Sequence, residues 1–135
     1  MKKILKLLKA TYELKKPPKK NIVFFDISHA NLIASKFKIK PDQYTTIYSN
    51  LEKINIYILI KSLFSHYFNF KFNLFNYYLE FIKYTNAKIV ITLIDNNVTF
   101  YKFKQYLPHI KFISVQNGHR SENRDWFLIL KKNYN

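Results

Sequence analysis

Three short apolar runs divide this chain, and each one ends abruptly in a cluster of polar residues. The runs are residues 22–25, 88–94 and 111–115, and the second is the most regular, because it is β-branched and nearly all apolar. An apolar run of this length without alternating polar residues is typical of a strand that is buried on both faces. Such strands need helices on both sides, so this feature predicts an α/β fold with a mostly parallel sheet.

Residues with helical spacing follow two of these runs. After the first run the repeating apolar positions are Ala30, Ile33, Ala34 and Phe37, with Ser28 as the expected N-cap. After the second run they are Phe100, Phe103 and Leu107, and Pro108 ends the helix. The alternation of strand and helix predicts parallel strands joined by right-handed crossovers.

The segments between these units predict one further strand and two further helices. Residues 44–48 have the composition of a short strand, and residues 74–85 that of an amphipathic helix with Asn73 as its cap. The apolar face of that helix, which we expect in the core, holds Phe75, Tyr78, Leu79 and Ile82. Residues 54–67 are strand-like in composition, but their length favours a helix. Its expected buried face holds Ile56, Ile60, Leu63, Phe64 and Tyr67. Residues 126–130 form a further apolar run, either strand or helix.

The first 20 residues differ from the rest of the chain. They contain eight lysines and one acid, Glu13, in a chain with a net charge of +15. Leu5, Leu8 and Tyr12 form a weak helical stripe that two prolines at positions 17 and 18 should end. Two interpretations stay open, an amphipathic helix resting on anionic lipid and a solvated lysine-rich tail. We therefore divide the chain into a basic segment, residues 1–20, and one α/β domain, residues 21–135.

Composition excludes several classes of function. The chain has no cysteine and four scattered histidines, so we expect no metal site. Neither a P-loop nor a G-x-G-x-x-G motif is present in a chain with one glycine, so we expect no nucleotide cofactor. There is no apolar run near the roughly 20 residues that span a bilayer and no convincing secretion signal, which favours the cytoplasm. The positive charge has two explanations, a functional one and an A/T-rich codon bias that inflates lysine.

Polar clusters at the carboxyl ends of the predicted strands mark the candidate binding site, because parallel sheets bind ligands there. The three clusters are Asp26, Ser28 and His29, then Asp95, Asn96 and Asn97, then Gln116, Asn117, Gly118, His119 and Arg120. The side chains of the second cluster suit a hydroxyl-rich ligand. Helix capping explains its two asparagines equally well.

The third cluster offers acid–base and anion-binding groups. His119 suits a general base, with Asp95 as the other catalytic candidate, and Arg120 suits a phosphate or carboxylate. Each has an ordinary alternative, since an exposed histidine is commonly just polar surface. Gly118 indicates a backbone position with positive φ, which either a tight turn or a ligand contact requires.

The segments NIVFFDISHANLI and INIYILIKSLF and the stretch from Tyr77 to Arg120, which contains IVITLIDNN and FISVQNG, carry a resemblance. Over about residues 21–120 the chain resembles the amino-terminal half of bacterial surface carbohydrate biosynthesis proteins, which are similar to GT-B glycosyltransferases and lipopolysaccharide biosynthesis enzymes. The resemblance implies a Rossmann-like three-layer sandwich that faces a glycan or lipid-linked acceptor. It also implies that the residues after the second and third apolar runs, residues 88–94 and 111–115, line a cleft.

In that family the carboxyl-terminal domain holds most of the donor sugar nucleotide. The resemblance therefore implies that this chain is truncated or half of a split protein, inactive alone, and dependent on a donor-binding half or partner subunit. It also implies metal-independent transfer, in which a base deprotonates the acceptor hydroxyl and cations stabilise the leaving phosphate. Peripheral contact with the anionic inner face of the cytoplasmic membrane fits the basic first segment.

The rival interpretation is a small basic RNA-binding protein. Lysine-rich ends and many aromatic residues could supply phosphate contacts and stacking platforms. The chain has only two arginines and one glycine, and its aromatic residues fall mainly on faces that we expect in the core. Nucleic acid is therefore the less favoured partner.

Overall fold

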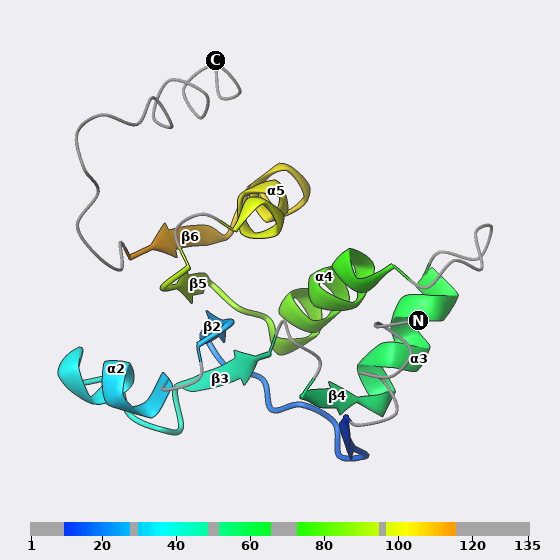
Figure 1. The fold of residues 1–135 in the computed structure, drawn as a ribbon, viewed down its shortest axis with the longest axis horizontal. Coiled ribbons are helices and arrows are strands. Elements are labelled where there is room, and N and C mark those ends of the chain that lie inside the picture. The colour runs from blue at the N-terminus through cyan, green and yellow to red at the C-terminus, as the bar shows by residue number, and fades with distance from the viewer. Residues whose placement is uncertain (1–9, 28–29, 49–51, 66–72, 95–96, 116–135) are drawn as a thin grey trace.

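The computed structural model describes residues 10–27, 30–48, 52–65, 73–94 and 97–115. These residues form an α/β fold with parallel sheets and four helices (Figure 1). In chain order the elements are β1 (Thr11–Glu13), β2 (Ile22–Phe25), α2 (Ala30–Lys36), β3 (Tyr44–Ile47), β4 (Lys53–Asn55), α3 (Ile56–Ser65), α4 (Leu74–Thr85), β5 (Ile89–Thr92), α5 (Val98–Tyr106) and β6 (Lys111–Ser114).

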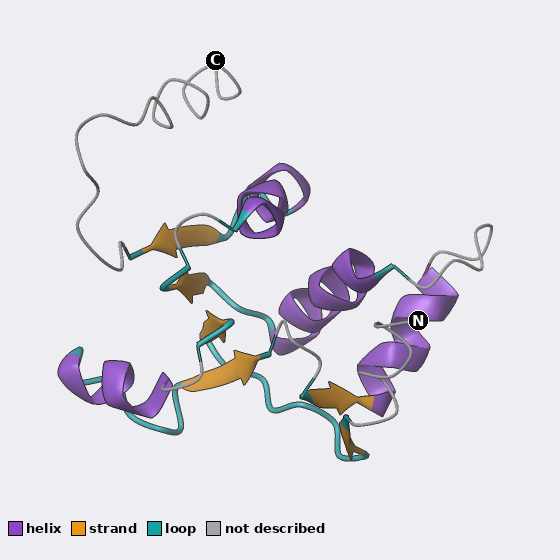
Figure 2. Ribbon diagram, in the orientation of Figure 1, coloured by secondary structure: helices purple, strands orange, loops and turns teal. Residues whose placement is uncertain are grey.

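The main sheet has four parallel strands in the order β3-β2-β5-β6 (Figure 2). The strands expected around residues 22–25, 44–48, 88–94 and 111–115 are all confirmed, and β2 and β5 are the two interior strands. One row of the register runs across three strands, with Phe25 opposite Thr92 and Thr92 opposite Ser114. This row lies at the carboxyl ends of the strands, where the polar clusters begin.

Side chains of the central strands alternate between two apolar cores. Val23 and Phe25 of β2 pack with α3, α4 and α5 in the larger core. Phe24 points the other way and packs with Ala30 and Ala34 of α2. Helix α2 therefore covers one face of the sheet, and α4 and α5 cover the other (Figure 1).

The placement of the helices agrees with the handedness that parallel connections prefer. The connection through α2 runs outward from β2 to β3, and the connection through α5 runs in the opposite direction, from β5 to β6. Two crossings of the same hand in opposite directions put their helices on opposite faces of a sheet. The helices α2 and α5 do occupy opposite faces.

A second, two-stranded parallel sheet forms where residues 1–20 meet the rest of the chain. Strand β1 pairs with β4, so that Tyr12 lies opposite Ile54. Tyr12 is therefore part of a strand, and the helical stripe expected through Leu5, Leu8 and Tyr12 does not reach it; the first two lie outside the described residues. Pairing with a strand distant in the sequence has overridden a weak helical pattern here.

Helices α4 and α5 match the predictions closely. Asn73 caps α4, because its side-chain oxygen accepts a hydrogen bond from the Phe75 amide at 3.0 Å. The aromatic stripe of α4 is core as predicted, and its buried members include Tyr78, Leu79 and Ile82. The expected face of α5 is also confirmed, because Phe100, Phe103 and Leu107 are all buried.

Helix α3 confirms the helix expected within residues 54–67 but reverses its face. The predicted buried residues Ile60, Leu63 and Phe64 are exposed, whereas Ile58 and Ser62 are buried. The physical reason lies at the start of the helix, where β4 pairs with β1 and directs the opposite side of α3 toward α4. The expected stripe on α2 is also only partly right, because Phe37 lies beyond the helix and is exposed.

The reversed face of α3 makes a prediction about stability. Ile58 is 0% exposed and Ile60 is 48% exposed, although the two side chains have the same size. We expect Ile58→Ala to lower the free energy of unfolding by about 2–5 kcal/mol, because it removes buried methyl groups and leaves a cavity. The matched variant Ile60→Ala should cost less than about 1 kcal/mol. Urea denaturation followed by circular dichroism measures both, and equal losses would contradict this orientation of α3.

Candidate functional site

The strand order places the carboxyl ends of β2 and β5 at a topological switch point of the sheet. From β2 the chain leaves for α2 on one face of the sheet, and from β5 it leaves for α5 on the other face. Ligands of open parallel sheets bind at such a switch point, outside the carboxyl ends of the strands. Asp26 follows β2 directly and Asn97 begins α5, so the structure brings these two predicted site residues to one edge of the sheet.

Asp26 has an unusual backbone conformation. Its φ angle is 60°, in the left-handed region that aspartate tolerates better than most residues other than glycine. Its amide donates a 2.8 Å hydrogen bond to the carbonyl of Ile47 at the end of β3. The ladder between β2 and β3 thus continues through Asp26 while the chain turns sharply away from the sheet.

The carboxylate of Asp26 influences the pKa of the Tyr78 hydroxyl of α4. Burial raises the pKa of the Tyr78 hydroxyl above its ordinary value of 10.0, and the negative charge of Asp26 raises it further, with a smaller effect of Tyr77. The Tyr78 ring is fixed against Phe25 in an edge-to-face contact with a centroid distance of 5.3 Å. A buried phenol thus lies near the predicted acid, and sequence spacing gave no sign of this pairing.

Asn97 is the N-cap of α5. Its side-chain oxygen accepts hydrogen bonds from the amides of Thr99 at 3.0 Å and Phe100 at 3.3 Å. The capping interpretation is therefore confirmed for Asn97. Its oxygen is occupied, and its NH₂ group is what remains for a ligand.

Two hydroxyl residues at the same edge were missed by the sequence analysis. Thr92 ends β5, and its Oγ1 accepts a 3.1 Å hydrogen bond from the amide of Ile94. Ser114 ends β6, and its Oγ is buried without a hydrogen-bond partner among the described residues. The sequence marks each of them only as a hydroxyl residue near the end of an apolar run, residues 88–94 and 111–115, and the strand ends become clear only in the structure.

The other candidate residues lie outside the described residues, so the structure gives no geometry for them. They are Ser28, His29, Asp95, Asn96, Gln116, Asn117, Gly118, His119 and Arg120. Within the described ranges no group of three or more acidic or histidine side chains gathers in a way that could hold a metal ion. No helix in those ranges is long and apolar enough to cross a bilayer.

A separate cleft of about 230 Å³ lies between the two sheets. One wall is the ribbon of β1 and β4, the other is β3, and α4 forms the floor. Its polar lining comes from Glu13, Thr46, Tyr48, Lys53, Asn55 and Tyr77. The sequence analysis did not anticipate this cleft, because its walls are brought together only by the pairing of β1 with β4.

Comparison with protein-family models, with curated proteins and with solved structures found no match to this chain.

The contact between Asp26 and Tyr78 makes a prediction about pH. Tyr78 stays protonated in the folded protein at pH values where an unfolded tyrosine ionises, near 10. The resulting stabilisation is complete below pH 10 and is lost as the pH rises through the higher folded pKa. We expect Asp26→Asn to lower the pKa of Tyr78, although burial, the larger cause, keeps it above 10.

Alkaline titration of ¹³Cζ-tyrosine by NMR measures this change. The variant Asp42→Asn removes the same charge from the turn before β3, at the amino ends of the strands. It should leave the pKa of Tyr78 unchanged. An unchanged pKa in both variants would contradict the coupling between Asp26 and Tyr78.

The cap of α5 makes a second prediction. Asn97→Ala should lower the free energy of unfolding by about 0.5–2 kcal/mol, because the amides of Thr99 and Phe100 lose their acceptor. Asn97→Asp keeps an acceptor at that position and should retain most of the stability. Thermal unfolding of the three proteins measures the difference, and equal stability of the alanine variant would show that the cap contributes nothing.

Proposed function

We propose that the chain is a Rossmann-like three-layer domain that binds a glycan or lipid-linked acceptor in surface carbohydrate biosynthesis. In this proposal it is the acceptor-side half of a glycosyltransferase-like protein. It works with a donor-binding half or a partner subunit and is inactive in its absence.

The single observation that carries the proposal is the strand order β3-β2-β5-β6. This order puts the switch point at the ends of β2 and β5, and we place the ligand crevice there because Rossmann-like and related parallel folds bind their ligands at such a point. The polar groups at this edge favour hydroxyl groups as ligands. Asp26 supplies a carboxylate, and neither the hydroxyl of Ser114 nor the NH₂ group of Asn97 has a hydrogen-bond partner among the described residues.

Transfer would need further groups that the proposal assigns to the neighbouring loops. We propose His119 or Asp95 as the base that removes the proton from the acceptor hydroxyl. Arg120 would stabilise the phosphate that leaves with the donor nucleotide. These roles apply to the assembled two-part protein.

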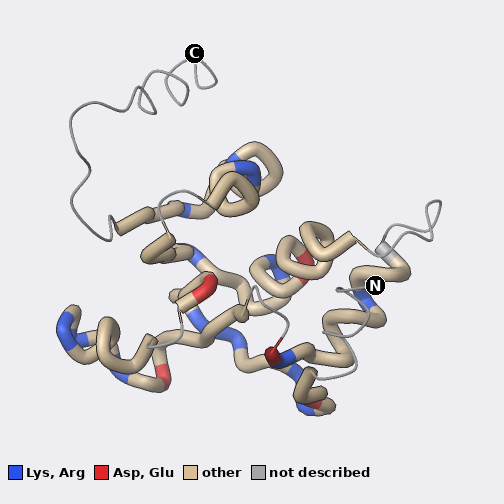
Figure 3. The backbone as a smooth tube through the Cα atoms, viewed as in Figure 1, with Lys and Arg blue, Asp and Glu red and all other residues tan. Residues whose placement is uncertain are grey.

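Location beside the cytoplasmic membrane is part of the proposal. Lys15, Lys16 and Lys19 are exposed in the segment between β1 and β2, and acidic residues are few across the described chain (Figure 3). Each lysine close to an anionic lipid surface contributes about 1 kcal/mol of attraction. The lysine-rich segment therefore suits peripheral contact with the inner leaflet.

Ligand titrations followed by ¹H–¹⁵N NMR test the proposal. We expect acceptor-type oligosaccharides to shift the amide signals of Asp26, Thr92 and Asn97, and nucleotide sugars to shift none of them. Asp26→Ala should weaken binding of the oligosaccharide about tenfold, because it removes a charged hydrogen-bond acceptor. Asp42→Ala, which removes the same charge far from the crevice, should not.

The same titrations with single-stranded RNA separate the rival function. An RNA-binding protein would bind RNA with an affinity that falls steeply with salt, and it would ignore the oligosaccharides. The described structure argues against RNA binding, because several aromatic side chains are buried and cannot stack with bases. They are Tyr77, Tyr78, Phe100 and Phe103. Salt-dependent RNA binding without sugar binding would overturn our proposal.

A further inference from the structure

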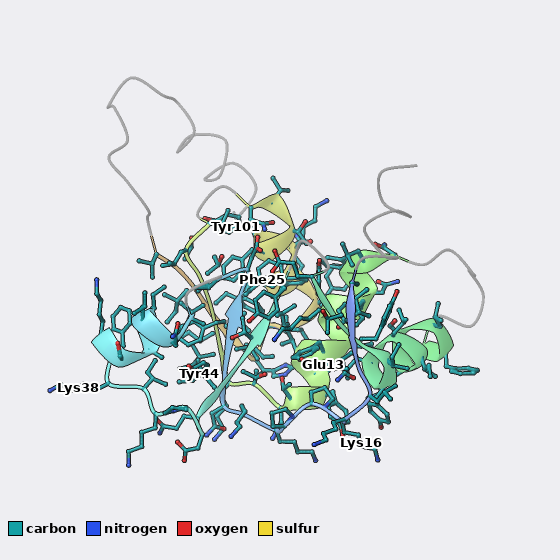
Figure 4. The ribbon with its side chains drawn as sticks, turned by 60° about the horizontal axis from the view of Figure 1, so that its bottom comes forward. Glu13, Lys16, Phe25, Lys38, Tyr44 and Tyr101 are labelled. Carbon is teal, nitrogen blue, oxygen red and sulfur yellow. The ribbon has the colours of Figure 1, made fainter. Side chains whose placement is uncertain are left out.

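The cleft between the two sheets lies at the carboxyl ends of three strands. Glu13 is the last residue of β1, Asn55 is the last residue of β4, and Tyr48 directly follows β3. Figure 4 labels Glu13 on β1 and Tyr44 on β3, the strands that form its opposite walls. None of the lining residues belongs to the polar clusters that follow β2, β5 and β6.

Tyr77 presents a hydroxyl group to this cleft. Its oxygen accepts a 2.9 Å hydrogen bond from the amide of Asn55, and no described residue accepts its hydrogen. The side chain of Asn55 is engaged elsewhere, because its Oδ1 accepts a bond from the amide of Ile58 and its Nδ2 donates to the carbonyl of Lys15. Buried donors are nearly always satisfied in proteins, so the Tyr77 hydroxyl is available for an acceptor on a ligand.

Glu13 supplies the complementary acceptor. Its carboxylate lies close enough to Tyr77 to contribute to the raised pKa of that hydroxyl, after the larger effect of burial. No lysine or arginine of the described chain forms an ion pair with it, although the chain has a net charge of +15. The carboxylate oxygens can therefore accept hydrogen bonds from a ligand that enters the cleft.

The charges of the lining select a neutral ligand. Lys53 lies on the same wall as Glu13, two register positions away along the ribbon of β1 and β4, with its Nζ 5.5 Å from the centre of the Tyr48 ring. An anionic ligand meets the carboxylate of Glu13, and a cationic ligand meets the ammonium group of Lys53. A neutral polar molecule avoids both repulsions and can use both groups.

The size of the cleft limits the ligand further. Pockets for drug-sized molecules enclose about 300–1,000 Å³, and this cleft of about 230 Å³ falls below that range. A nucleotide sugar is therefore too large, whereas a single sugar ring is of suitable size. Apolar lining residues, Pro17, Ile47 and Phe81, can contact the C–H face of such a ring.

We propose that the cleft is a binding subsite for one neutral monosaccharide unit, recognised by the carboxylate of Glu13 and the hydroxyl of Tyr77. One sugar hydroxyl can donate to Glu13 and accept from Tyr77 at the same time, which neither an ammonium group nor a phosphate can do. The subsite is separate from the crevice between β2 and β5. Its chemistry stands without the assignment to glycosyl transfer.

NMR titration of the full chain with glucose, galactose and N-acetylglucosamine tests the proposal. We expect at least one of them to bind in the millimolar range, as is usual for a ligand of this size, and to shift the amide signals of Thr46, Lys53 and Asn55. Glucosamine as a cation and glucose 6-phosphate as an anion should bind more weakly. Amides beside the other crevice, Asp26 and Thr92, report on the proposed acceptor site in the same spectra.

Two variants and one control make the test specific. Glu13→Gln should weaken binding about tenfold, because a neutral amide accepts weaker hydrogen bonds than a carboxylate. Tyr77→Phe should weaken it similarly, but it also removes the acceptor of the Asn55 amide and so lowers the melting temperature. Glu13→Gln, on an exposed strand position, keeps the test valid if that variant fails to fold. Asp42→Asn should bind as the wild type does.

Three outcomes overturn the proposal. Binding that shifts Asp26 and Thr92 but not Thr46 and Asn55 would reject the cleft while supporting the acceptor site. Tighter binding of either charged sugar would reject the neutral ligand class. Absence of binding by all sugars, or equal binding by Glu13→Gln, would reject the subsite itself.

Discussion

The side chains of Val23, Phe24 and Phe25 are all removed from solvent, so β2 needs apolar cover on both faces at once. Each such burial stabilises the fold by about 1.5–3 kcal/mol, and that contribution is lost if the face on which the side chain lies is uncovered. Helix α2 supplies one cover, and α4 and α5 supply the other. Because β2 also pairs on both edges, β3 and β5 flank it, and the switch point at its carboxyl end follows from that arrangement.

Asn55 connects the smaller sheet to this core. Its backbone amide bonds to Tyr77 of α4, its Nδ2 to the carbonyl of Lys15, and its Oδ1 to the amide of Ile58. One buried residue thus holds the segment after β1, the start of α3 and the first turn of α4 together. The orientation of α3 is fixed at this junction and reinforced by an ion pair of 3.7 Å between Lys61 and the buried Glu80. The outward apolar side of α3 is a consequence of that anchoring.

Local patterns in the sequence predicted most of the main sheet. The apolar runs of β2 and β5, the cap Asn73 and the face of α5 depend on short-range spacing, and all of them are confirmed. The side of α3 that is buried and the ribbon of β1 and β4 depend on contacts between residues about 40 positions apart, which spacing cannot reveal.

The candidate site likewise has one part that short-range patterns predicted and one part that depends on contacts between distant residues. Parallel topology brings Asp26 and Asn97 to one edge, as the polar clusters predicted, because strand ends are a local signal. Two electrostatic interactions, of Asp26 with Tyr78 and of Glu13 with Tyr77, connect residues of different elements. No sequence motif predicts either of them. Among the described residues, three non-glycine residues adopt left-handed backbone angles, and Asp26 and Asn86 are of types that tolerate them. Nothing in the sequence marks the third, Lys38.

The strand order also determines when the central strand pair can form during synthesis of the chain. Ile22 pairs with Ile89, so the central strand pair cannot form until the ribosome has added nearly seventy further residues. At about 5–20 residues per second, β2 waits several seconds for β5 after it leaves the ribosome. During that interval α2 and β3 are its available partners, and the face that α4 and α5 later cover stays open. A nascent chain of this protein therefore exposes the apolar face of β2 during this interval, and a chaperone that binds apolar segments can bind it there.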